Sequence, residues 1–424
     1  TSLDCSKGNI IGEDCLGGNF YAKPDGTGFS ETCDDVDSDG ICDDSYTHAI
    51  QNIDDYPLTN IKISEPLDEC DSCKDCTAKL QIAGPGDTIK VTADLYMETG
   101  MPNLAIGWCI NFNGTDEVTL DCQDHEIIGT DQGNKYGIWL SDEGDGSKGN
   151  TISDCVIRDF YSAIFLEASD DNEITGCEAE SNYGGLRLVE SDGNTISGFY
   201  SSQNADNGID IFRSSNNLLK QLEIFDNTEG TGIYIRAYTD GPPSNNNIIS
   251  TSSLHNNAWG AVRFVGDCDE NIVKDSRMEK NSWYAMAIED WHPEPAKVPE
   301  NNLVYNNYFN NTYNFFFGGD YYPAEQFLST ELDCSLKNII GGDCIGGNFW
   351  ANPEGTGFSE ACEDIEVPFG VCDTFFNRTN DHVRIDWYPL ARESSPAHPS
   401  CSDGIKNQDE TDEDFGGSCK LCDL

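Results

Sequence analysis

Short runs in which apolar and polar residues alternate return along the middle of the chain at a nearly fixed interval. Each run follows a phrase Asn-x-Ile or Asn-x-Leu, and the phrases begin at Asn150, Asn172, Asn194 and Asn216, each 22 residues after the last. Alternation predicts strands with one buried face, and a fixed period predicts stacked units that bury their apolar faces against one another. Two or three short strands without a helix in each unit correspond to about one turn of a parallel β-helix.

The alternation also predicts which side chains enter the core. Because successive side chains of a strand point to opposite faces, Ile138 and Leu140 would face inward and Trp139 outward. The same register gives one inward pair in each later unit: Ile164/Leu166, Leu186/Leu188, Ile209/Ile211, Ile233/Ile235, Val262/Phe264 and Met286/Ile288. The asparagines are expected to occupy turns with left-handed backbone, and their stacked amides to hydrogen-bond from coil to coil.

Two segments outside the repeats are near-copies of each other. Residues 3–20 return as 332–349, and Gly-Thr-Gly-Phe-Ser-Glu and Tyr-Pro-Leu follow in both copies. Four cysteines in each copy predict two internal disulfides, with three pairings open. The second copy follows the last coil directly and would cap it. The corresponding cysteines are Cys5, Cys15, Cys33 and Cys42 in the first copy and Cys334, Cys344, Cys362 and Cys372 in the second.

The order of these features predicts five segments in an all-β protein. They are an N-terminal disulfide-rich calcium-binding module at 1–60, a cysteine-rich linker at 61–80, the parallel β-helix at 81–330, the second module at 331–392, and a linker with an acidic cysteine-containing tail at 393–424.

The charge balance limits the class of partner. The chain of 424 residues has 24 Lys and Arg against 76 Asp and Glu, a formal net charge of −52. This excess argues against nucleic acid or an anionic membrane as partner and favours bound cations. No apolar run is long enough to span a bilayer. The 19 cysteines, mostly in loop-rich acidic segments, indicate an oxidising, extracellular or cell-surface location.

The clearest metal-binding motif lies in the first module. Asp35, Asp37 and Asp39 alternate before a glycine, the carbonyl of Ile41 follows, and Asp43 comes next. This spacing reproduces the first half of a Ca²⁺ loop, because Ca²⁺ accepts many hard oxygen ligands on a tight turn. A solvated acidic turn is the alternative. We therefore predict Ca²⁺ as the cofactor.

The second module keeps only part of this loop. Asp364, Glu366 and Asp373 remain, but Pro368 stands in place of the third aspartate. These three acids form a second, weaker candidate metal site.

The remaining cysteines suggest further cross-links. Cys70, Cys73 and Cys76 could ligate zinc, but no fourth ligand stands nearby and disulfides are the better interpretation. Cys109 and Cys122 are predicted to pair across adjacent coils. Cys155 and Cys177 occupy the same position in successive coils, where stacked thiols and a bond are equally consistent. The tail adds three more disulfide candidates: Cys401, Cys419 and Cys422.

The outward column of the coils is a candidate contact surface. Aromatic, basic and acidic side chains alternate along it, a mixture that suits either sugars or another subunit. The alternative is a set of ion pairs between neighbouring coils, and no paired-acid catalytic motif is recognisable. The column consists of Trp139, Phe165, Arg187, Asp210, Tyr234 and Arg263. Asn-x-Ser/Thr motifs predict N-glycosylation at Asn113, Asn310 and Asn377.

In three regions the chain resembles the NosD-like family of right-handed parallel β-helix proteins, especially multi-repeat surface proteins of archaea. The Asn-x-Ile coils match across about 130–320, Gly86-Asp-Thr-Ile-Lys-Val resembles the family's start, and Gly-Gly-Asn-Phe with Tyr-Pro-Leu resembles its end. The tail is similar to a four-cysteine secreted motif, with Phe415 where a cysteine is usual. The resemblance implies a right-handed β-helix. The family mixes copper-delivery accessories, carbohydrate-acting proteins and surface proteins, and the 4 Met and 6 His form no cluster for copper.

These observations predict a secreted, calcium-stabilised structural or adhesive cell-surface protein. A capping module at the N-terminal end, without a coil to cover, suggests head-to-tail self-association into a filament or array. The alternative is a carbohydrate-active lyase or hydrolase, or a glycan-binding module, that uses the outward face of the sheet.

Overall fold

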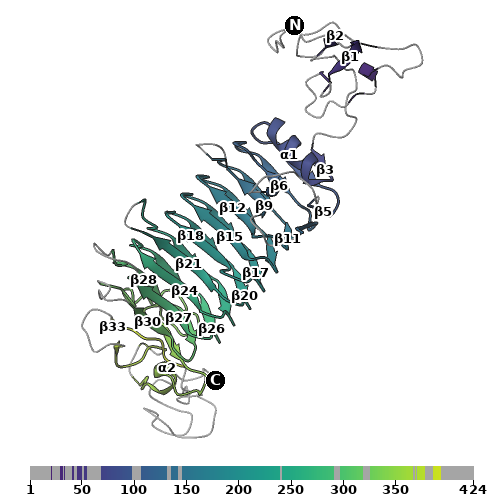
Figure 1. The fold of residues 1–424 in the computed structure, drawn as a ribbon. Coiled ribbons are helices and arrows are strands. Elements are labelled where there is room, and N and C mark those ends of the chain that lie inside the picture. Colours follow the sequence, from purple (N-terminus) through teal and green to yellow (C-terminus); the bar gives the residue numbers. More distant parts are fainter. Residues whose placement is uncertain are drawn as a thin grey trace, which may run out of the picture. The chain divides into compact units, whose positions relative to one another are not determined.

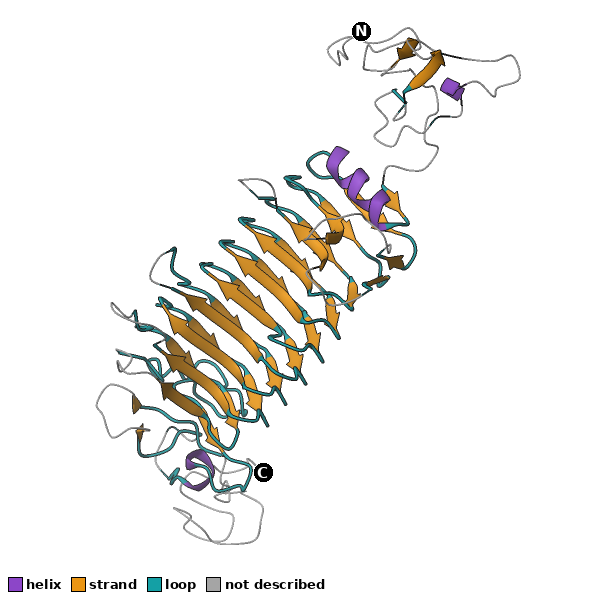
Figure 2. Ribbon diagram, viewed as in Figure 1, coloured by secondary structure: helices purple, strands orange, loops and turns teal. Residues whose placement is uncertain are grey.

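The computed structural model describes residues 68–97, 107–130, 135–141, 146–238, 241–290, 297–318, 325–365, 368, 370–377 and 385–392, with short stretches at 21, 29–31, 33, 41–42, 45–49 and 52–54. The chain divides into two compact units, residues 1–177 and 178–424, which are described in turn. Both are built mainly from short parallel strands, so the predicted right-handed parallel β-helix is confirmed (Figures 1 and 2).

In the first unit, three parallel sheets each receive one strand per coil. The first sheet contains β3 (Glu69–Cys70), β4 (Thr88–Val91), β7 (Thr119–Asp121), β10 (Thr151–Ser153) and β13 (Glu173–Thr175), the second β5 (Leu95–Tyr96), β8 (Glu126–Ile128) and β11 (Val156–Arg158), and the third β6 (Gly107–Asn111), β9 (Lys135–Leu140) and β12 (Ser162–Glu167). Outside the sheets lie η1 (Phe29–Glu31), the antiparallel pair β1 (Tyr46–Ala49) and β2 (Asn52–Asp54), and α1 (Cys73–Ile82).

The second unit repeats the three-sheet arrangement. Its first sheet contains β16 (Thr195–Ser197), β19 (Leu218–Lys220), β22 (Ile248–Ser250), β25 (Ile272–Lys274) and β28 (Leu303–Tyr305). The second contains β14 (Glu178–Glu180), β17 (Tyr200–Ser202), β20 (Glu223–Phe225), β23 (Ser253–His255), β26 (Arg277–Glu279), β29 (Tyr308–Asn310) and β31 (Phe349–Ala351). The third contains β15 (Gly184–Val189), β18 (Ile209–Phe212), β21 (Thr231–Ala237), β24 (Gly260–Gly266), β27 (Tyr284–Glu289) and β30 (Phe315–Gly318).

The core is the narrow space that the three sheets enclose. Every predicted inward pair on the third sheet is buried, and the register aligns these pairs from coil to coil. In the second unit, for example, Ile209 lies opposite Ile233 and Ile211 opposite Ile235. The alternation of the sequence therefore identified the aliphatic core correctly.

A column of buried asparagines runs where the first sheet begins. Asn150 donates through its backbone N and its Nδ2 to Oδ1 of Asn172, at 2.9 and 3.2 Å. In the second unit Asn194 donates in the same way to Asn217, at 2.8 and 3.2 Å. The predicted coil-to-coil amide bonds exist, but the assignment of Asn216 to this column was wrong. The series continues through Asn247, Asn271 and Asn302.

The left-handed backbone belongs to the residue before each ladder asparagine. Gly149, Asp171, Gly193 and Asn216 have φ values of 67°, 58°, 71° and 62°. These residues turn the chain at the surface, whereas the next residue directs its amide into the stack. The predicted left-handed conformation of the ladder asparagines was therefore wrong by one position.

The second module ends the stack of the second unit. Its strand β31 pairs in parallel with β29, so Phe349, Trp350 and Ala351 form one more rung of the second sheet. Asn307 donates through Nδ2 to Oδ1 of Asn348 at 3.0 Å, and the backbone N of Asn348 donates to the buried Asp386 at 2.8 Å. The remaining elements of the module are α2 (Phe358–Ala361) and the antiparallel pair β32 (Phe376–Asn377) and β33 (Ile385–Asp386).

The two copies of the module share described contacts. The backbone N of Tyr21 donates to Oγ of Ser30 at 2.8 Å, and the backbone N of Trp350 donates to Oγ of Ser359 at 2.8 Å. The disulfides Cys33–Cys42 and Cys362–Cys372 also correspond, and the second copy adds Cys334–Cys344. Cys5 and Cys15 lie outside the described residues.

Three further disulfides connect the first coils. Cys70 pairs with Cys76 and Cys73 with Cys109, so the three linker cysteines form disulfides. The predicted pair Cys109–Cys122 was wrong. Cys122 follows β7 and Cys155 follows β10, and these two cysteines are bonded because they lie at the same corner of neighbouring coils.

The last predicted core cysteine has no such bond. Cys177 is a buried free thiol, as is Cys268. The tail cysteines Cys401, Cys419 and Cys422 lie outside the described residues.

Candidate functional site

On the outward face of the third sheet, each unit brings neighbouring members of the predicted contact column together. In the second unit Arg187 lies opposite Asp210, Asp210 opposite Tyr234, and Tyr234 opposite Arg263. In the first unit Trp139 lies opposite Phe165, and their rings stack with centroids 6.4 Å apart. Each side chain thus stands on the coil and the face that the alternation predicted.

The acid in this column is engaged by two arginines. Arg236, on β21, donates from Nε and Nη2 to the two oxygens of Asp210 at 3.0 and 2.9 Å. Nε of Arg187 lies 3.5 Å from Oδ2 of the same carboxylate. The predicted ion pair between neighbouring coils is present, but the stronger bidentate partner, Arg236, was not identified from the sequence.

Tyr234 lies between two guanidinium groups. The guanidinium carbons of Arg236 and Arg263 are 5.2 and 5.1 Å from its ring centroid, a distance suited to cation–π attraction. Nη2 of Arg263 in turn donates to Oε2 of Glu289 at 2.6 Å. Burial raises the pKa of Tyr234, so its phenol stays neutral. Asp210, Tyr234, Arg236, Arg263 and Glu289 thus form a polar belt on the sheet.

Beside the belt the face is hollowed. A cavity of about 670 Å³ is lined by nine residues, most of them aromatic, and it falls within the size range of small-ligand sites. Trp259, Trp283, Tyr313 and Phe316 remain 41, 61, 60 and 46% exposed around it. The rings of Trp259 and Trp283 stack 5.4 Å apart at 15°. The lining consists of Trp259, Arg263, Ser282, Trp283, Tyr284, Glu289, Tyr313, Phe315 and Phe316.

A glycine makes room for one wall of this cavity. A Cβ at Gly260 would lie 2.3 Å from Cε2 of Tyr284, so only glycine lets this ring lie against the sheet. Tyr284 stacks on Phe316 with centroids 6.0 Å apart, and burial raises the pKa of Tyr284 to about 12. The cavity therefore presents flat, uncharged rings.

These aromatic residues were not predicted from the sequence, because most of them lie outside the outward strand positions and the outward column was not extended to β30, where Phe316 lies opposite Ala287. A usable signal was present: Tyr183, Trp259 and Trp283 each stand three residues before the first inward residue of their coil. This position is the corner that leads into the third sheet.

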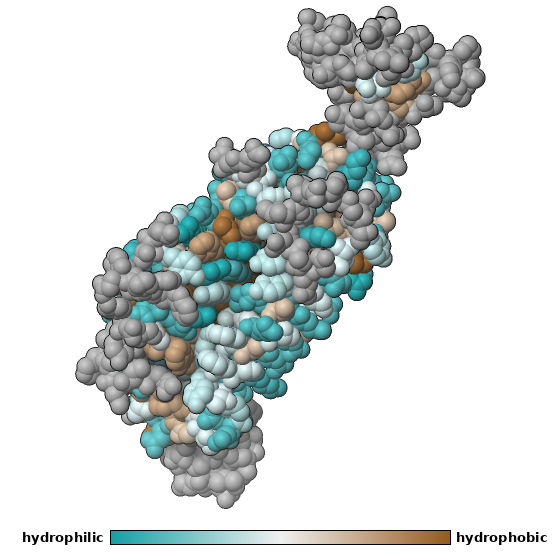
Figure 3. Space-filling model, viewed as in Figure 1, coloured by the Kyte–Doolittle hydropathy of each residue, from teal (hydrophilic) through white to brown (hydrophobic). Residues whose placement is uncertain are grey.

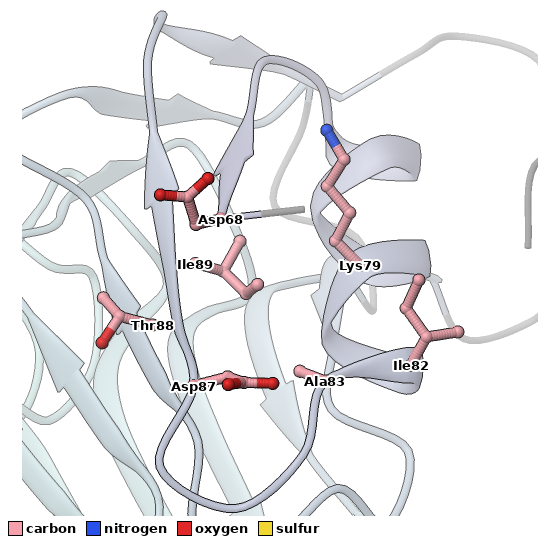
Figure 4. A pocket seen from close by; sticks show the side chains of 7 residues that line it. All are labelled: Asp68, Lys79, Ile82, Ala83, Asp87, Thr88 and Ile89. Atoms are coloured by element: carbon pink, nitrogen blue, oxygen red, sulfur yellow. The ribbon is translucent and has the colours of Figure 1, made fainter. Parts of the chain in front are cut away.

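A second, smaller hollow of about 200 Å³ lies beside α1 (Figure 4). Its polar groups serve the helix: Nζ of Lys79 donates to Oδ2 of Asp75 at 3.0 Å, and Oδ2 of Asp87 accepts from the backbone N of Gly84 at 2.8 Å. Ser72 caps the helix by accepting from the backbone N of Asp75. We interpret this hollow as part of the structure that covers the first coil.

The predicted metal sites lie largely outside the described residues. This holds for Asp35, Asp37, Asp39 and Asp43, whereas Ile41 is described and buried. Among the described residues, no group of three or more His, Cys, Asp or Glu is arranged to hold a metal ion. Calcium at this loop remains a prediction.

In the second module, Glu366 also lies outside the described residues. Oδ2 of Asp364 accepts from the backbone N of Gly370 at 2.9 Å, and Oδ2 of Asp373 accepts from the backbone N of Ile365 at 3.0 Å. The candidate ligands therefore also hold the module's loop together.

The predicted glycosylation sites differ in their surroundings. Asn113 is exposed in a turn with φ 47°. Asn310 and Asn377 are half-buried at the ends of β29 and β32. Asn113 is the most accessible acceptor of the three, and modification of all three remains a prediction.

Residues 86–355 match the model of a protein family described as "Periplasmic copper-binding protein (NosD)". This range is more than half of the chain. The chain belongs to the NosD family. No curated protein matches the sequence significantly. In the described part of this NosD-family chain, no helix has both the length and the apolar character that a membrane crossing requires.

Several solved structures are similar to the chain. The enzymatically active domain of tailspike protein 2 from bacteriophage CBA120 is 10% identical over 62% of this chain and 47% of that chain, with a TM-score of 0.44. The A-module of an Azotobacter vinelandii mannuronan C-5 epimerase is 14% identical over 57% and 74%, with a TM-score of 0.42. A DFA-IIIase from Arthrobacter chlorophenolicus A6 is 12% identical over 55% and 64%, with a TM-score of 0.37. The chain spans less than two thirds of the tailspike domain and of the DFA-IIIase.

The family description raises the question of copper, which prefers imidazole and sulfur ligands. Nδ1 of His125 lies 3.2 Å from Asp94, and Nε2 of His255 lies 2.8 Å from Glu223, so each pairs with one carboxylate. Burial raises the pKa of the Cys177 thiol to about 12, which keeps the sulfur protonated. The described residues do not fit a copper site.

Proposed function

We propose that this NosD-family protein is an extracellular carbohydrate-binding protein with an adhesive role. The observation that carries the proposal is the aromatic cavity on the third sheet, where Trp259, Trp283, Tyr313 and Phe316 are between 41 and 61% exposed. Exposed rings bordered by polar groups suit sugars, which present both apolar and hydroxyl-bearing faces. Exposed apolar surface of this kind is typical of a binding site.

The geometry favours binding over cleavage. Glycoside hydrolysis needs two carboxyl groups that flank the scissile bond, one as acid and one as base or nucleophile. Asp210 is held by Arg236 and Arg187, and Glu289 is held by Arg263. Carboxylates that are paired with arginines in this way hold the side chains of the polar belt in place.

The disulfides support an extracellular location. Six disulfides occur among the described residues, and such bonds persist in oxidising surroundings. The described surface visible in Figure 3 is mainly hydrophilic to intermediate, with a few apolar patches, and the net charge of −52 favours solubility. The periplasmic label of the family agrees with this location.

Replacing Trp259 by alanine is expected to weaken glycan binding about tenfold or more, because it removes one of two stacked rings. A glycan array and then calorimetry with the best oligosaccharide measure the effect. Tyr200→Ala is the matched control, since Tyr200 is an exposed aromatic on the second sheet of the same unit. Equal affinity in Trp259→Ala and the natural protein would refute the site.

Calcium is proposed as the stabilising ion of the first module. If the loop from Asp35 to Asp43 binds Ca²⁺, chelation lowers the unfolding temperature of this module, because an ion bound only to the folded state stabilises it. The double substitution Asp37→Ala, Asp39→Ala is expected to abolish the difference between calcium and chelator. The idea fails if the natural module melts at the same temperature in calcium and in chelator.

Head-to-tail assembly also remains a prediction, since most of the first module lies outside the described residues.

A further inference from the structure

A column of residues marks the corner before the third sheet in the second unit. Its five members each lie three residues before the first inward residue of their coil. The backbone N of Asp206 donates to the carbonyl of Tyr183 at 2.6 Å, and the backbone N of Trp259 donates to the carbonyl of Gly230 at 3.0 Å. The members, in coil order, are Tyr183, Asp206, Gly230, Trp259 and Trp283.

The column carries aromatic side chains at both ends and none between them. Tyr183 is 39% exposed at one end, and the stacked rings of Trp259 and Trp283 stand at the other. Gly230 carries no side chain because the backbone of Asp206 already fills that space, and a Cβ at Gly230 would lie 2.3 Å from the carbonyl carbon of Asp206. The aromatic members of the column are therefore separated by the rungs of Asp206 and Gly230.

Successive rungs of a parallel sheet are about 4.8 Å apart. This spacing is close to the length of one pyranose unit in an extended polysaccharide. A linear chain that runs from coil to coil would thus place about one sugar over each of the five rungs, with one end against the stacked pair Trp259 and Trp283 and the other end against Tyr183.

The charges around the column favour an uncharged ligand. The arginines on this face, Arg187, Arg236 and Arg263, each pair with Asp210 or Glu289. Burial, and then the nearby Asp210, raise the pKa of Asp206. Its carboxyl oxygens can accept hydrogen bonds from the hydroxyl groups of a sugar. An anionic sugar would meet, in addition, the net charge of −52.

We propose that this column is the binding path of an uncharged linear polysaccharide, which runs from coil to coil with about one sugar per rung, contacts the aromatic rings at both ends of the column and is hydrogen-bonded by Asp206 between them. The inference rests on the proposed carbohydrate-binding function. It adds the class of glycan, its direction along the coils, and the use of a second aromatic site at Tyr183.

The test measures the affinity of the whole chain for cello-, xylo-, manno- and N-acetylchito-oligosaccharides of increasing length, with oligogalacturonates as the charged series. Affinity for an uncharged series is expected to rise up to about five units and then to level off. Tyr183→Ala should weaken binding of pentamers about tenfold and leave trimers nearly unchanged, whereas Trp259→Ala should weaken both. Asp206→Asn keeps a hydrogen-bonding side chain and should bind pentamers better than Asp206→Ala.

The outcomes separate this inference from the function on which it rests. One outcome is binding that is lost in Trp259→Ala and yet depends neither on length beyond three units nor on Tyr183. This result contradicts the extended binding path but retains the aromatic cavity as the carbohydrate site. A preference for oligogalacturonates overturns the uncharged class of ligand. Absence of binding to every oligosaccharide and to a glycan array overturns the inference and the proposed function together.

Discussion

Replacing Asn247 by leucine is expected to destabilise the second unit by about 3 kcal/mol. The buried Asn247 donates through Nδ2 to the carbonyl of Ser214 and to Oδ1 of Asn271, both at 3.0 Å. Its Oδ1 accepts from the backbone N and from Nδ2 of Asn217, both at 3.0 Å. Leucine has a similar size but leaves these partners without hydrogen bonds in a place that water does not reach. Denaturant unfolding of the two proteins measures the loss.

The neighbouring residue provides a matched control. Asn246 is exposed, with φ 57°, and glycine adopts this conformation without strain. Asn246→Gly should therefore change the stability by less than about 1 kcal/mol. Equal losses in both variants would mean that the amide ladder contributes no more than the turn beside it.

Stability of the second module is expected to fall as the pH rises from acid to neutral, and Asp386 is the cause. Burial raises the pKa of Asp386 from 3.8 to about 7, although Asn348, Trp350 and Tyr388 donate hydrogen bonds that lower it. The folded state therefore binds more protons than the unfolded state between these two values. Its stability is greatest at the acid end and falls through the window by roughly 4 kcal/mol. Thermal unfolding followed by tryptophan fluorescence between pH 4 and pH 8 records this slope.

The substitution Asp386→Asn should flatten the slope, because the amide resembles the protonated carboxyl and does not ionise. Since the chain is strongly acidic, the loss of any negative charge changes the pH dependence to some extent. Glu354→Gln, an exposed substitution in the same module, controls for this general effect. Parallel slopes in Asp386→Asn and the natural protein would contradict the assignment.

The fold was predictable because burial imposes a pattern on every coil. Inward pairs such as Ile209 and Ile211 recur wherever a strand covers the core. The constant period, by contrast, was partly a coincidence. Partners in the asparagine ladder from Asn194 to Asn302 are 23, 30, 24 and 31 residues apart, because loops of different length leave each coil. Asn216 fitted a spacing of 22 only because it precedes the true ladder residue.

Less of the candidate site than of the fold could be predicted from the sequence. Alternation places Arg187 and Asp210 on one face, but it does not show that Arg236 reaches Asp210 from the next coil. The cavity depends on corner residues such as Trp283 and on the absent side chain at Gly260, and neither follows from strand periodicity. The disulfide Cys73–Cys109 depends on where α1 lies over the first coils, which is a tertiary property.

The described amide-to-amide bonds of the asparagine ladder all have one polarity, since each asparagine donates to Oδ1 of the asparagine in the coil that follows it. Asn302, the last asparagine of this ladder, meets a different acceptor, Oε1 of Gln326 at 3.1 Å, and Asn348 meets Asp386. A coil duplicated between Asn194 and Asn302 would receive and pass on the same bonds as its neighbours. Genes of this type can therefore gain or lose whole coils by recombination without any change in the groups that close the stack. Homologues are expected to differ in length by complete coils, and to vary least at the positions of Gln326 and Asp386.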